Sequence, residues 1–173
     1  MNNMYNRFDE IYKIMESSFP KSEFRTYDGQ RALLSSPYYR VLTETDSNDK
    51  TIAFLASWEF SSFRFVEHFA VDPTLRGGGT GGKLLNKYIS QSQIPVRLEV
   101  EPPESDFAKR RIGFYERLGF HLNSFDYVQP PLREGQPLLP LNIMSYPDPL
   151  TEEEFAHFKE TVYSEVYKMN LLN

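Results

Sequence analysis

The segment from Phe63 to Leu85 reads FRFVEHFAVDPTLRGGGTGGKLL. Its first half is rich in aromatic and β-branched residues and ends at Asp72-Pro73, which predicts a strand that stops where proline cannot donate a ladder hydrogen bond. Five glycines then occupy the six positions from Gly77 to Gly82, directly before an amphipathic stretch that predicts a helix. A helix that begins in glycines exposes backbone N–H groups at the positive end of its dipole. The segment therefore predicts an anion-binding site, and phosphate is the usual ligand of such a site.

Two common phosphate motifs fit these glycines poorly. The run Gly77–Lys83 has the Walker A spacing, but Leu84 stands where that motif needs Ser or Thr to hold magnesium. The same glycines also have the spacing of a dinucleotide-binding turn. However, Pro73–Arg76 separates the strand from the glycines, and too little chain follows to build two mononucleotide-binding halves. Both motifs are therefore disfavoured.

A third pattern fits without conflict. The sequence Arg76-x-x-Gly79-x-Gly81 resembles the Arg/Gln-x-x-Gly-x-Gly/Ala signature of the GNAT superfamily of N-acetyltransferases. Further on, the segment Phe114–Phe120 (FYERLGF) is similar to the late helix of that family, in which Tyr is followed closely by Gly-Phe. Two motifs in this order are more specific than either alone, and the resemblance covers residues 63–120. It implies an α/β (α+β) fold with a mixed, twisted sheet of about six to seven strands flanked by helices.

The resemblance also implies an acetyl-CoA site. The pantetheine arm would pair with the backbone near Phe69, Ala70 and Val71. The pyrophosphate would bind the loop formed by Arg76, Gly77, Gly78, Gly79, Thr80, Gly81 and Gly82. The family pattern has Asn and Ala at two positions of the late helix where this chain has Ala108 and Arg111, so Arg111, or its neighbour Arg110, is expected to make a phosphate contact instead. No metal is expected.

Acetyl transfer to an amine requires proton movements at two places. The amine must lose a proton before it attacks, and the departing thiolate benefits from gaining one. The resemblance implies that Tyr115 is the general acid for the thiolate. Glu67 is the first candidate for the base, because a carboxylate on an otherwise apolar strand is costly unless it is used or paired. Strand alternation predicts that Glu67 shares a face with Phe69 and Val71, and that His68 points to the other face in a structural role.

Glu99 is the second candidate for the base. It shares a face of the predicted strand over residues 94–101 with Glu101, and either carboxylate could act through a water molecule. The acceptor is expected to be a small-molecule amine or a peptide. Two other functions remain open at this point. The chain could bind acyl-CoA without catalysis, as a sensor, or it could be a nucleotide-binding module.

Composition limits the remaining possibilities. The 173 residues fit one domain, 1–173, with core motifs in 63–120 and a helical extension in 151–173. A net charge of −5 argues against nucleic acid as the main partner, and the absence of cysteine excludes a thiolate nucleophile. No apolar run approaches the ~20 residues of a membrane span, and the polar first residues do not resemble a signal peptide. We therefore expect a cytoplasmic monomer or homodimer.

Periodicity predicts the other elements. Helices are expected over residues 8–19, 22–34, 105–118 and 151–169, and strands over 39–44, 51–60, 121–128 and 138–146. Thr151 and Glu154 form a capping box at the start of the last helix. The helix has an apolar stripe made of Phe155, Phe158, Val162, Val166 and Met169. We expect this stripe to pack on its own domain, and a dimer contact is the alternative.

Overall fold

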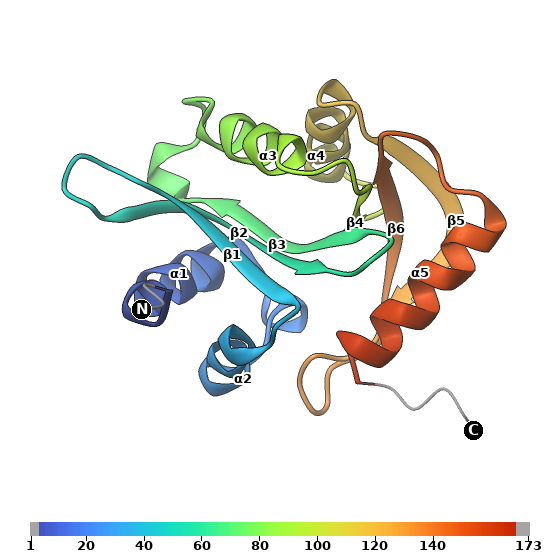
Figure 1. Ribbon diagram of the computed structural model, residues 1–173, viewed down its shortest axis with the longest axis horizontal. Helices are drawn as coiled ribbons and strands as arrows, with labels where there is room; N and C mark the ends of the chain where they lie inside the picture. The colour runs from blue at the N-terminus through green and yellow to red at the C-terminus, as the bar shows by residue number, and fades with distance from the viewer. Residues whose placement is uncertain (1–3, 169–173) are drawn as a thin grey trace. The chain divides into compact units, whose positions relative to one another are not determined.

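A computed structural model describes residues 4–168, which contain five α-helices and six β-strands (Figure 1). The chain divides into two compact units, one ending at Ile94 and the other beginning at Pro95. No helix within the described residues is both long enough and apolar enough to cross a bilayer.

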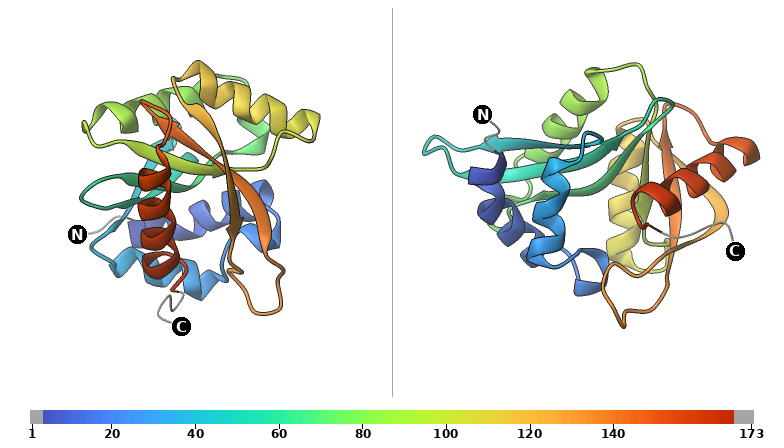
Figure 2. Two further views of the ribbon diagram at one scale, coloured as in Figure 1. Left: turned by 90° about the vertical axis from the view of Figure 1, so that its right-hand side faces the viewer. Right: turned by 60° about the horizontal axis from the view of Figure 1, so that its bottom comes forward.

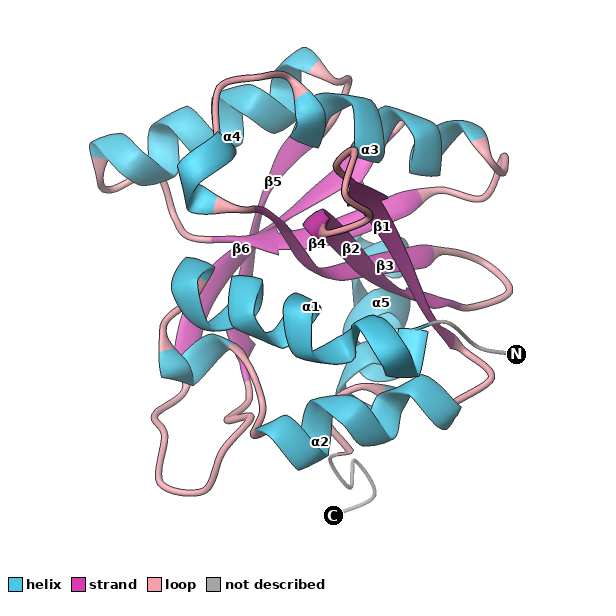
Figure 3. Ribbon diagram, turned by 90° about the vertical axis from the view of Figure 1, so that its left-hand side faces the viewer, coloured by secondary structure: helices cyan, strands magenta, loops and turns pink. Residues whose placement is uncertain are grey.

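The first unit is built on three antiparallel strands. These are β1 (Tyr39–Thr45), β2 (Thr51–Glu59) and β3 (Arg64–Val71). The helices α1 (Met4–Ser18) and α2 (Tyr27–Ala32) lie on one side of these strands, and α3 (Thr80–Ser90) lies on the other (Figures 1 and 3). The β2 strand is in the middle and is the most buried of the three, because helices cover both of its faces.

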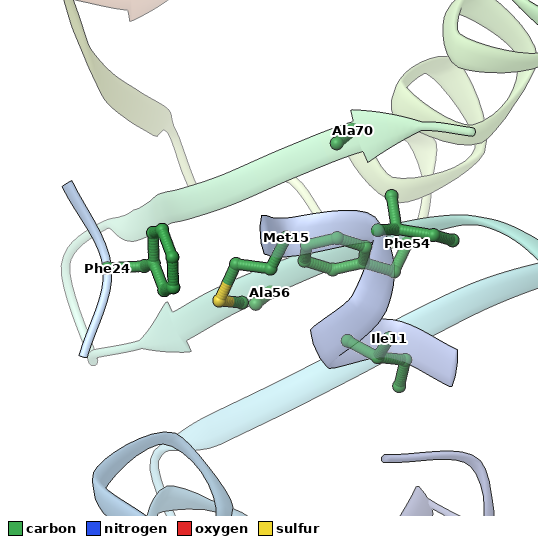
Figure 4. Close-up of a cluster of buried hydrophobic side chains, with 7 residues drawn as sticks. Ile11, Met15, Phe24, Phe54, Ala56 and Ala70 are labelled. Atoms are coloured by element: carbon green, nitrogen blue, oxygen red, sulfur yellow. The ribbon is translucent and has the colours of Figure 1, made fainter. Parts of the chain in front are cut away.

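The core beneath α1 explains why the periodic residues of that helix were recognisable from the sequence. Ile11, Ile14 and Met15 of α1 are buried against the apolar side chains of β2 and β3. Figure 4 shows Met15 beside Ala56 of β2. Phe24, which follows the helix, completes the cluster from the connecting segment.

The second predicted helix is shorter than expected. The sequence predicts one helix over 22–34, but the structure has a 3₁₀ turn at Lys21–Glu23, an extended residue at Phe24, and α2 only from Tyr27. The Thr26 hydroxyl accepts a hydrogen bond from the Gly29 N–H at 3.2 Å and so begins the helix there. Phe24 is extended because its ring is buried in the core, and this tertiary contact outweighs helix propensity.

The end of α3 is closed by a buried arginine. The Arg64 guanidinium donates to the carbonyl oxygens of Tyr88 at 2.7 Å and Ile94 at 2.7 Å, and it also reaches those of Ile89 and Ser92. A cation at a helix C-terminus satisfies the last carbonyl groups and complements the helix dipole. Arg64 therefore satisfies the carbonyl groups of Tyr88 and Ile89 in the last turn of α3.

The second unit also contains three antiparallel strands. β6 (Leu139–Tyr146) lies between β4 (Val96–Val100) and β5 (His121–Gln129). The helices α4 (Asp106–Arg117) and α5 (Glu152–Glu165) lie on opposite faces of these strands (Figure 2).

The C-terminal helix α5 packs on its own unit, as the sequence predicts. Phe155 stacks on Phe125 of β5 with ring centroids 4.4 Å apart, and the Tyr163 hydroxyl donates to the Val128 carbonyl oxygen. Phe158, Val162 and Val166 of the predicted stripe are buried, whereas Met169 lies outside the described residues. The capping box is confirmed, because the Glu154 N–H donates to Thr151 Oγ1 at 3.1 Å and the Thr151 N–H to Glu154 Oε1 at 2.9 Å.

Candidate active site

Two residues of the glycine loop have a backbone conformation that is unfavourable for any residue with a side chain. Gly77 and Gly79 have φ values of +96° and +79°, in the left-handed region that residues with a Cβ rarely adopt. A Cβ built at Gly77, Gly79 or Gly82 would meet no atom within 4 Å. The loop therefore needs glycine at two positions for its conformation, and it faces open space at these three.

The start of α3 carries unsatisfied donors. Gly79 is the N-cap residue, and it has no side chain that could accept a hydrogen bond from the first turn. Within residues 4–168, no group accepts a hydrogen bond from any backbone N–H between Gly77 and Gly82. The N–H groups of the first turn lie at the positive end of the helix dipole, which makes this helix start a site for an anion such as a pyrophosphate.

The residues on the N-terminal side of the loop are held in place. The Asp72 carboxylate accepts hydrogen bonds from the N–H and the hydroxyl of Thr74, at 2.9 and 2.8 Å, which lower the pKa of Asp72. Arg76 is exposed, and its Nη2 donates to Ser18 Oγ at the end of α1 at 3.3 Å. The loop thus leaves β3 through a fixed 3₁₀ turn (Pro73–Leu75) and carries the positive charge of Arg76.

The predicted pantetheine-binding segment is the end of β3. Phe69, Ala70 and Val71 pair with Leu55, Phe54 and Ala53 of β2, respectively. Phe69 and Ala70 are buried and Val71 is half-buried. The pairing with β2 fixes this backbone as a regular strand up to the residue before the turn.

A β-bulge changes the direction of Glu67. Val66 pairs with Ser57 and His68 with Ala56, so Glu67 is an extra residue without a register partner on β2. As a result, Glu67 and His68 both reach the segment before α2. Arg25 Nη1 donates to Glu67 Oε2 at 2.9 Å, and His68 Nε2 donates to the Glu23 carbonyl oxygen at 2.6 Å. The prediction that these two side chains face opposite ways is wrong, because simple alternation does not hold across a bulge.

Glu67 is a buried, ion-paired carboxylate. Its side chain is 2% exposed and that of its partner Arg25 is 12% exposed. The Trp58 indole N–H donates to the other oxygen, Oε1, at 2.8 Å. Burial alone would raise the pKa of Glu67, but the Arg25 charge, the nearby His68 and the hydrogen bonds from Trp58 and Arg25 together lower it. Glu67 is thus held as a stable anion.

Tyr115 of α4 is a buried tyrosine whose hydroxyl forms no hydrogen bond with residues 4–168. The residue is 3% exposed, and its ring contacts Phe114 and Phe120 with centroids 5.3 and 5.7 Å apart. Nothing in the described part of the chain forms a hydrogen bond with its hydroxyl. A hydroxyl that forms no hydrogen bond with the described residues is free to bond to a ligand atom. Ser105 caps α4 through a hydrogen bond from the Ala108 N–H, as predicted.

Glu99 of β4 has a different environment from that of Glu67. Its carboxylate accepts hydrogen bonds from two neutral phenols, those of Tyr127 on β5 and Tyr167 after α5. Glu101 lies just beyond the end of β4 and is half-buried, and Arg111 is half-buried on α4.

The predicted site residues therefore fall into two groups. Glu67, Phe69–Val71 and Arg76–Gly82 belong to the first unit, while Glu99, Arg111 and Tyr115 belong to the second. Sequence reasoning missed the partners of both carboxylates, which are Arg25 and Trp58 for Glu67 and Tyr127 and Tyr167 for Glu99. These contacts join residues 9 to 68 positions apart, and no local motif marks them.

No group of three or more His, Asp or Glu side chains in residues 4–168 is arranged to hold a metal ion.

Comparison with known proteins gives a consistent result. Residues 37–122 match the family model described as the acetyltransferase (GNAT) domain. The chain is 30% identical over 163 residues to "Putative acetyltransferase YjbC" of Bacillus subtilis (strain 168), with 90% of this chain and 80% of that protein covered.

Solved structures share the fold. A "Putative acetyltransferase from GNAT family" of Bacteroides thetaiotaomicron aligns with a TM-score of 0.87 at 32% identity, covering 95% of this chain and 94% of that chain. A phosphinothricin acetyltransferase of Sinorhizobium meliloti, solved in complex with acetyl-CoA, aligns with a TM-score of 0.59 at 16% identity, covering 82% and 83%. The α/β, mixed-sheet class predicted from the sequence, with a helix added at the C-terminal end, is confirmed.

Proposed function

Because the chain belongs to the GNAT family of acetyltransferases, we propose that it is an acetyl-CoA-dependent N-acetyltransferase. It transfers the acetyl group directly to a primary amine of a small molecule or a peptide, while both substrates are bound. The reaction needs no metal, because attack of a neutral amine on a thioester requires only proton transfers and polarisation of the carbonyl group.

The observation that carries the proposal is the open N-terminus of α3. Six consecutive residues, Gly77–Gly82, present backbone N–H groups that nothing in residues 4–168 satisfies. A pyrophosphate satisfies several such donors at once, in a place where the helix dipole favours negative charge. Arg76 adds a positive charge at the entrance to this loop, and Arg111 on α4 is proposed as a further phosphate contact. Phe69–Val71 then supply the backbone for the pantetheine arm.

Tyr115 is the proposed general acid. The amine nitrogen attacks the thioester carbonyl carbon, the carbon–sulfur bond breaks, and the Tyr115 hydroxyl gives its proton to the departing sulfur. The support is that this hydroxyl is on a buried ring and has no hydrogen-bond partner among the described residues. Residues 4–168 therefore leave this proton available for transfer.

Glu99 is the better candidate for the base, and it takes up the proton that the amine loses, directly or through a water molecule. Glu67 is the weaker candidate, because its ion pair with Arg25 stabilises the ionised form and lowers its pKa. A carboxylate that holds its negative charge so firmly has little tendency to accept a proton. Glu99 accepts hydrogen bonds from the uncharged hydroxyls of Tyr127 and Tyr167. We therefore assign the base to Glu99 and a structural role to Glu67.

The direct test is a turnover assay with acetyl-CoA and a panel of amines and peptides, read as CoA release. The wild type should turn over at least one acceptor. Tyr115→Phe should lower kcat by ~10²-fold with a similar affinity for acetyl-CoA, since a thiolate leaving group needs only modest help. Wild-type protein that binds acetyl-CoA but acetylates nothing in a broad panel would instead support a sensor.

A pair of variants tests the choice of base. Glu99→Gln should abolish the acid limb of the pH–rate profile and leave acetyl-CoA affinity unchanged. Glu67→Gln should keep that limb but lower the melting temperature, because the Arg25 guanidinium would remain buried without its counter-ion. The opposite pattern would return the base to Glu67.

A further inference from the structure

We propose that Tyr167, in the segment after α5, is a positioning residue for the base Glu99, so that the C-terminal helix contributes to the acetylation site. This inference rests on the proposed function. The added helix then does more than stabilise the fold, because it delivers a hydrogen-bond donor to the carboxylate that receives the amine proton.

The contact between Tyr167 and Glu99 involves both carboxylate oxygens. The Tyr167 hydroxyl lies 2.8 Å from Glu99 Oε1 and 2.9 Å from Oε2. The Tyr127 hydroxyl donates to Oε2 from β5. Donors from two separate elements fix the plane of the carboxylate, whereas one donor would leave it free to rotate about its terminal torsion.

The position of Tyr167 is set by the packing of α5. At its start, the helix is closed by the capping box, and Glu154 Oε2 lies 3.6 Å from Nη2 of the buried Arg97 on β4. At its end, the Tyr163 hydroxyl bonds to the Val128 carbonyl oxygen, and the Tyr167 N–H donates to the Val162 carbonyl oxygen at 3.1 Å. The helix is thus fastened to β4 and β5 before the chain reaches Tyr167.

Tyr163 and Tyr167 offer an internal comparison. They lie four residues apart in sequence, and their ring centroids are 6.3 Å apart. The hydroxyl of each one donates a hydrogen bond. Tyr163 donates to a backbone carbonyl, as expected of a tyrosine that only anchors a helix, whereas Tyr167 donates to an ionisable side chain of β4. A purely anchoring role does not require a carboxylate as the acceptor.

Three tyrosines lie near Glu99, and two of them donate hydrogen bonds to it. Tyr127 faces it from β5, Tyr163 from α5 and Tyr167 from the segment after α5. Burial and the Glu99 charge raise the pKa of Tyr163, although its bond to Val128 lowers it, so this phenol remains protonated. The other titratable residues of these elements are Arg97 on β4 with Glu101 just after it, His121 and Asp126 on β5, Glu152, Glu153, Glu154, His157, Lys159, Glu160 and Glu165 on α5, and Lys168 after Tyr167. Arg97 lies 3.6 Å from Glu154, and Lys159 lies over the Tyr163 ring. The hydrogen bonds that Glu99 accepts from Tyr127 and Tyr167 both come from phenols.

The test compares Tyr167→Phe with Tyr163→Phe in the full chain. Both changes remove one hydroxyl from neighbouring tyrosines, so both should lower the melting temperature by a few degrees at most. Only Tyr167→Phe should lower kcat, by roughly tenfold, and move the acid limb of the pH–rate profile to higher pH, because a carboxylate that loses a donor holds its proton more tightly. Acetyl-CoA affinity should stay the same in both variants. Tyr127→Phe should move the limb in the same direction.

A measurement without turnover provides the second readout. With ¹³C-labelled glutamate, the carboxyl signal of Glu99 should titrate at higher pH in Tyr167→Phe than in the wild type and in Tyr163→Phe. An active wild type whose pH profile and Glu99 titration are the same in all three proteins would overturn the positioning role and leave the proposed function intact. A wild type that acetylates no amine would overturn the proposed function, and this inference with it.

Discussion

The helices α3 and α5 begin in opposite ways. At α5, Thr151 and Glu154 satisfy each other's backbone N–H groups, and three acidic residues occupy the first turn. At α3, the N-cap is Gly79, the first turn carries no acid, and the N–H groups of Gly77–Gly82 have no acceptor in the described residues. One helix start is closed by its own side chains and stabilises the fold. The other is left open, and we propose that it serves a ligand.

The N-termini of both helices could be recognised in the sequence, for different reasons. A capping box needs a hydroxyl and a carboxylate three residues apart, as in the TEEE of residues 151–154. An anion site needs the absence of side chains that would compete with the ligand, as in the GGGTGG of residues 77–82. Substitutions at the two starts should therefore affect stability and ligand binding in opposite combinations.

The largest effect is expected for Gly82→Asp. Gly82 lies in the first turn of α3, and a Cβ there meets no atom within 4 Å. The new carboxylate would repel the pyrophosphate, so CoA affinity should fall on the order of 100-fold, or about 2.7 kcal/mol. The unfolding free energy should stay the same or rise by about 1 kcal/mol, because Asp stabilises the first turn of a helix and glycine destabilises a helix. Calorimetric titration and a denaturant melt measure the two quantities, and Gly82→Ala is the control without charge.

A smaller loss is expected for Gly79→Ala. The φ of +79° at this N-cap residue strains any residue with a Cβ, which costs about 1 kcal/mol of stability. The displaced loop should bind CoA about tenfold more weakly, or about 1.4 kcal/mol. Full CoA affinity in a folded Gly79→Ala protein would mean that the backbone of the loop does not form the site.

Thr151→Ala, at the start of α5, should lower stability and leave CoA affinity unchanged. The change removes the hydroxyl that accepts from the Glu154 N–H, so the unfolding free energy should fall by about 1 kcal/mol. CoA affinity should not change, because the proposed pyrophosphate site is formed by the backbone of Gly77–Gly82 and not by the capped start of α5. Weaker CoA binding in Thr151→Ala would mean that the start of α5 also affects ligand binding, contrary to the purely structural role given to it.

The smallest effect concerns pH. Hydrogen bonds with the Thr151 backbone and side chain, together with the Arg97 charge, lower the pKa of Glu154 from its ordinary value of 4.5, although burial opposes this. A lowered pKa in the folded state means that the contribution to stability is present above about pH 4.5 and is lost as the pH falls through the folded value. The destabilisation caused by Glu154→Gln should therefore be larger at pH 7 than at pH 3, and denaturant melts at the two pH values measure it.

Most of the fold could be predicted because its signals are local. The caps at Ser105 and Thr151 and the turn after β1 depend on residues within four positions of one another. Two predictions failed where contacts distant in sequence decided the structure. Phe24 interrupts the predicted helix because its ring belongs to the core, and the bulge at Glu67 arises from the pairing with β2, which alternation along one strand does not encode.

The candidate site was predicted less completely than the fold, for the same reason. The glycine loop is a continuous segment, so its backbone role was visible in the sequence. The behaviour of Glu67 and Glu99 depends instead on Arg25 and Tyr167, which lie 42 and 68 positions away from them. A cation next to one carboxylate and phenols next to the other reverse the order of preference that the sequence suggested.

An amide NMR titration of the ¹⁵N-labelled protein with CoA tests directly whether the open start of α3 binds the pyrophosphate. We expect saturable shifts of the amide signals of Gly77–Gly82, with no change at the Glu154 amide of α5. Pantetheine, which lacks the pyrophosphate, should leave the glycine signals in place. Saturable CoA binding that leaves the glycine amides unmoved, or glycine shifts of equal size with pantetheine, would contradict the claim that the open start of α3 binds the pyrophosphate.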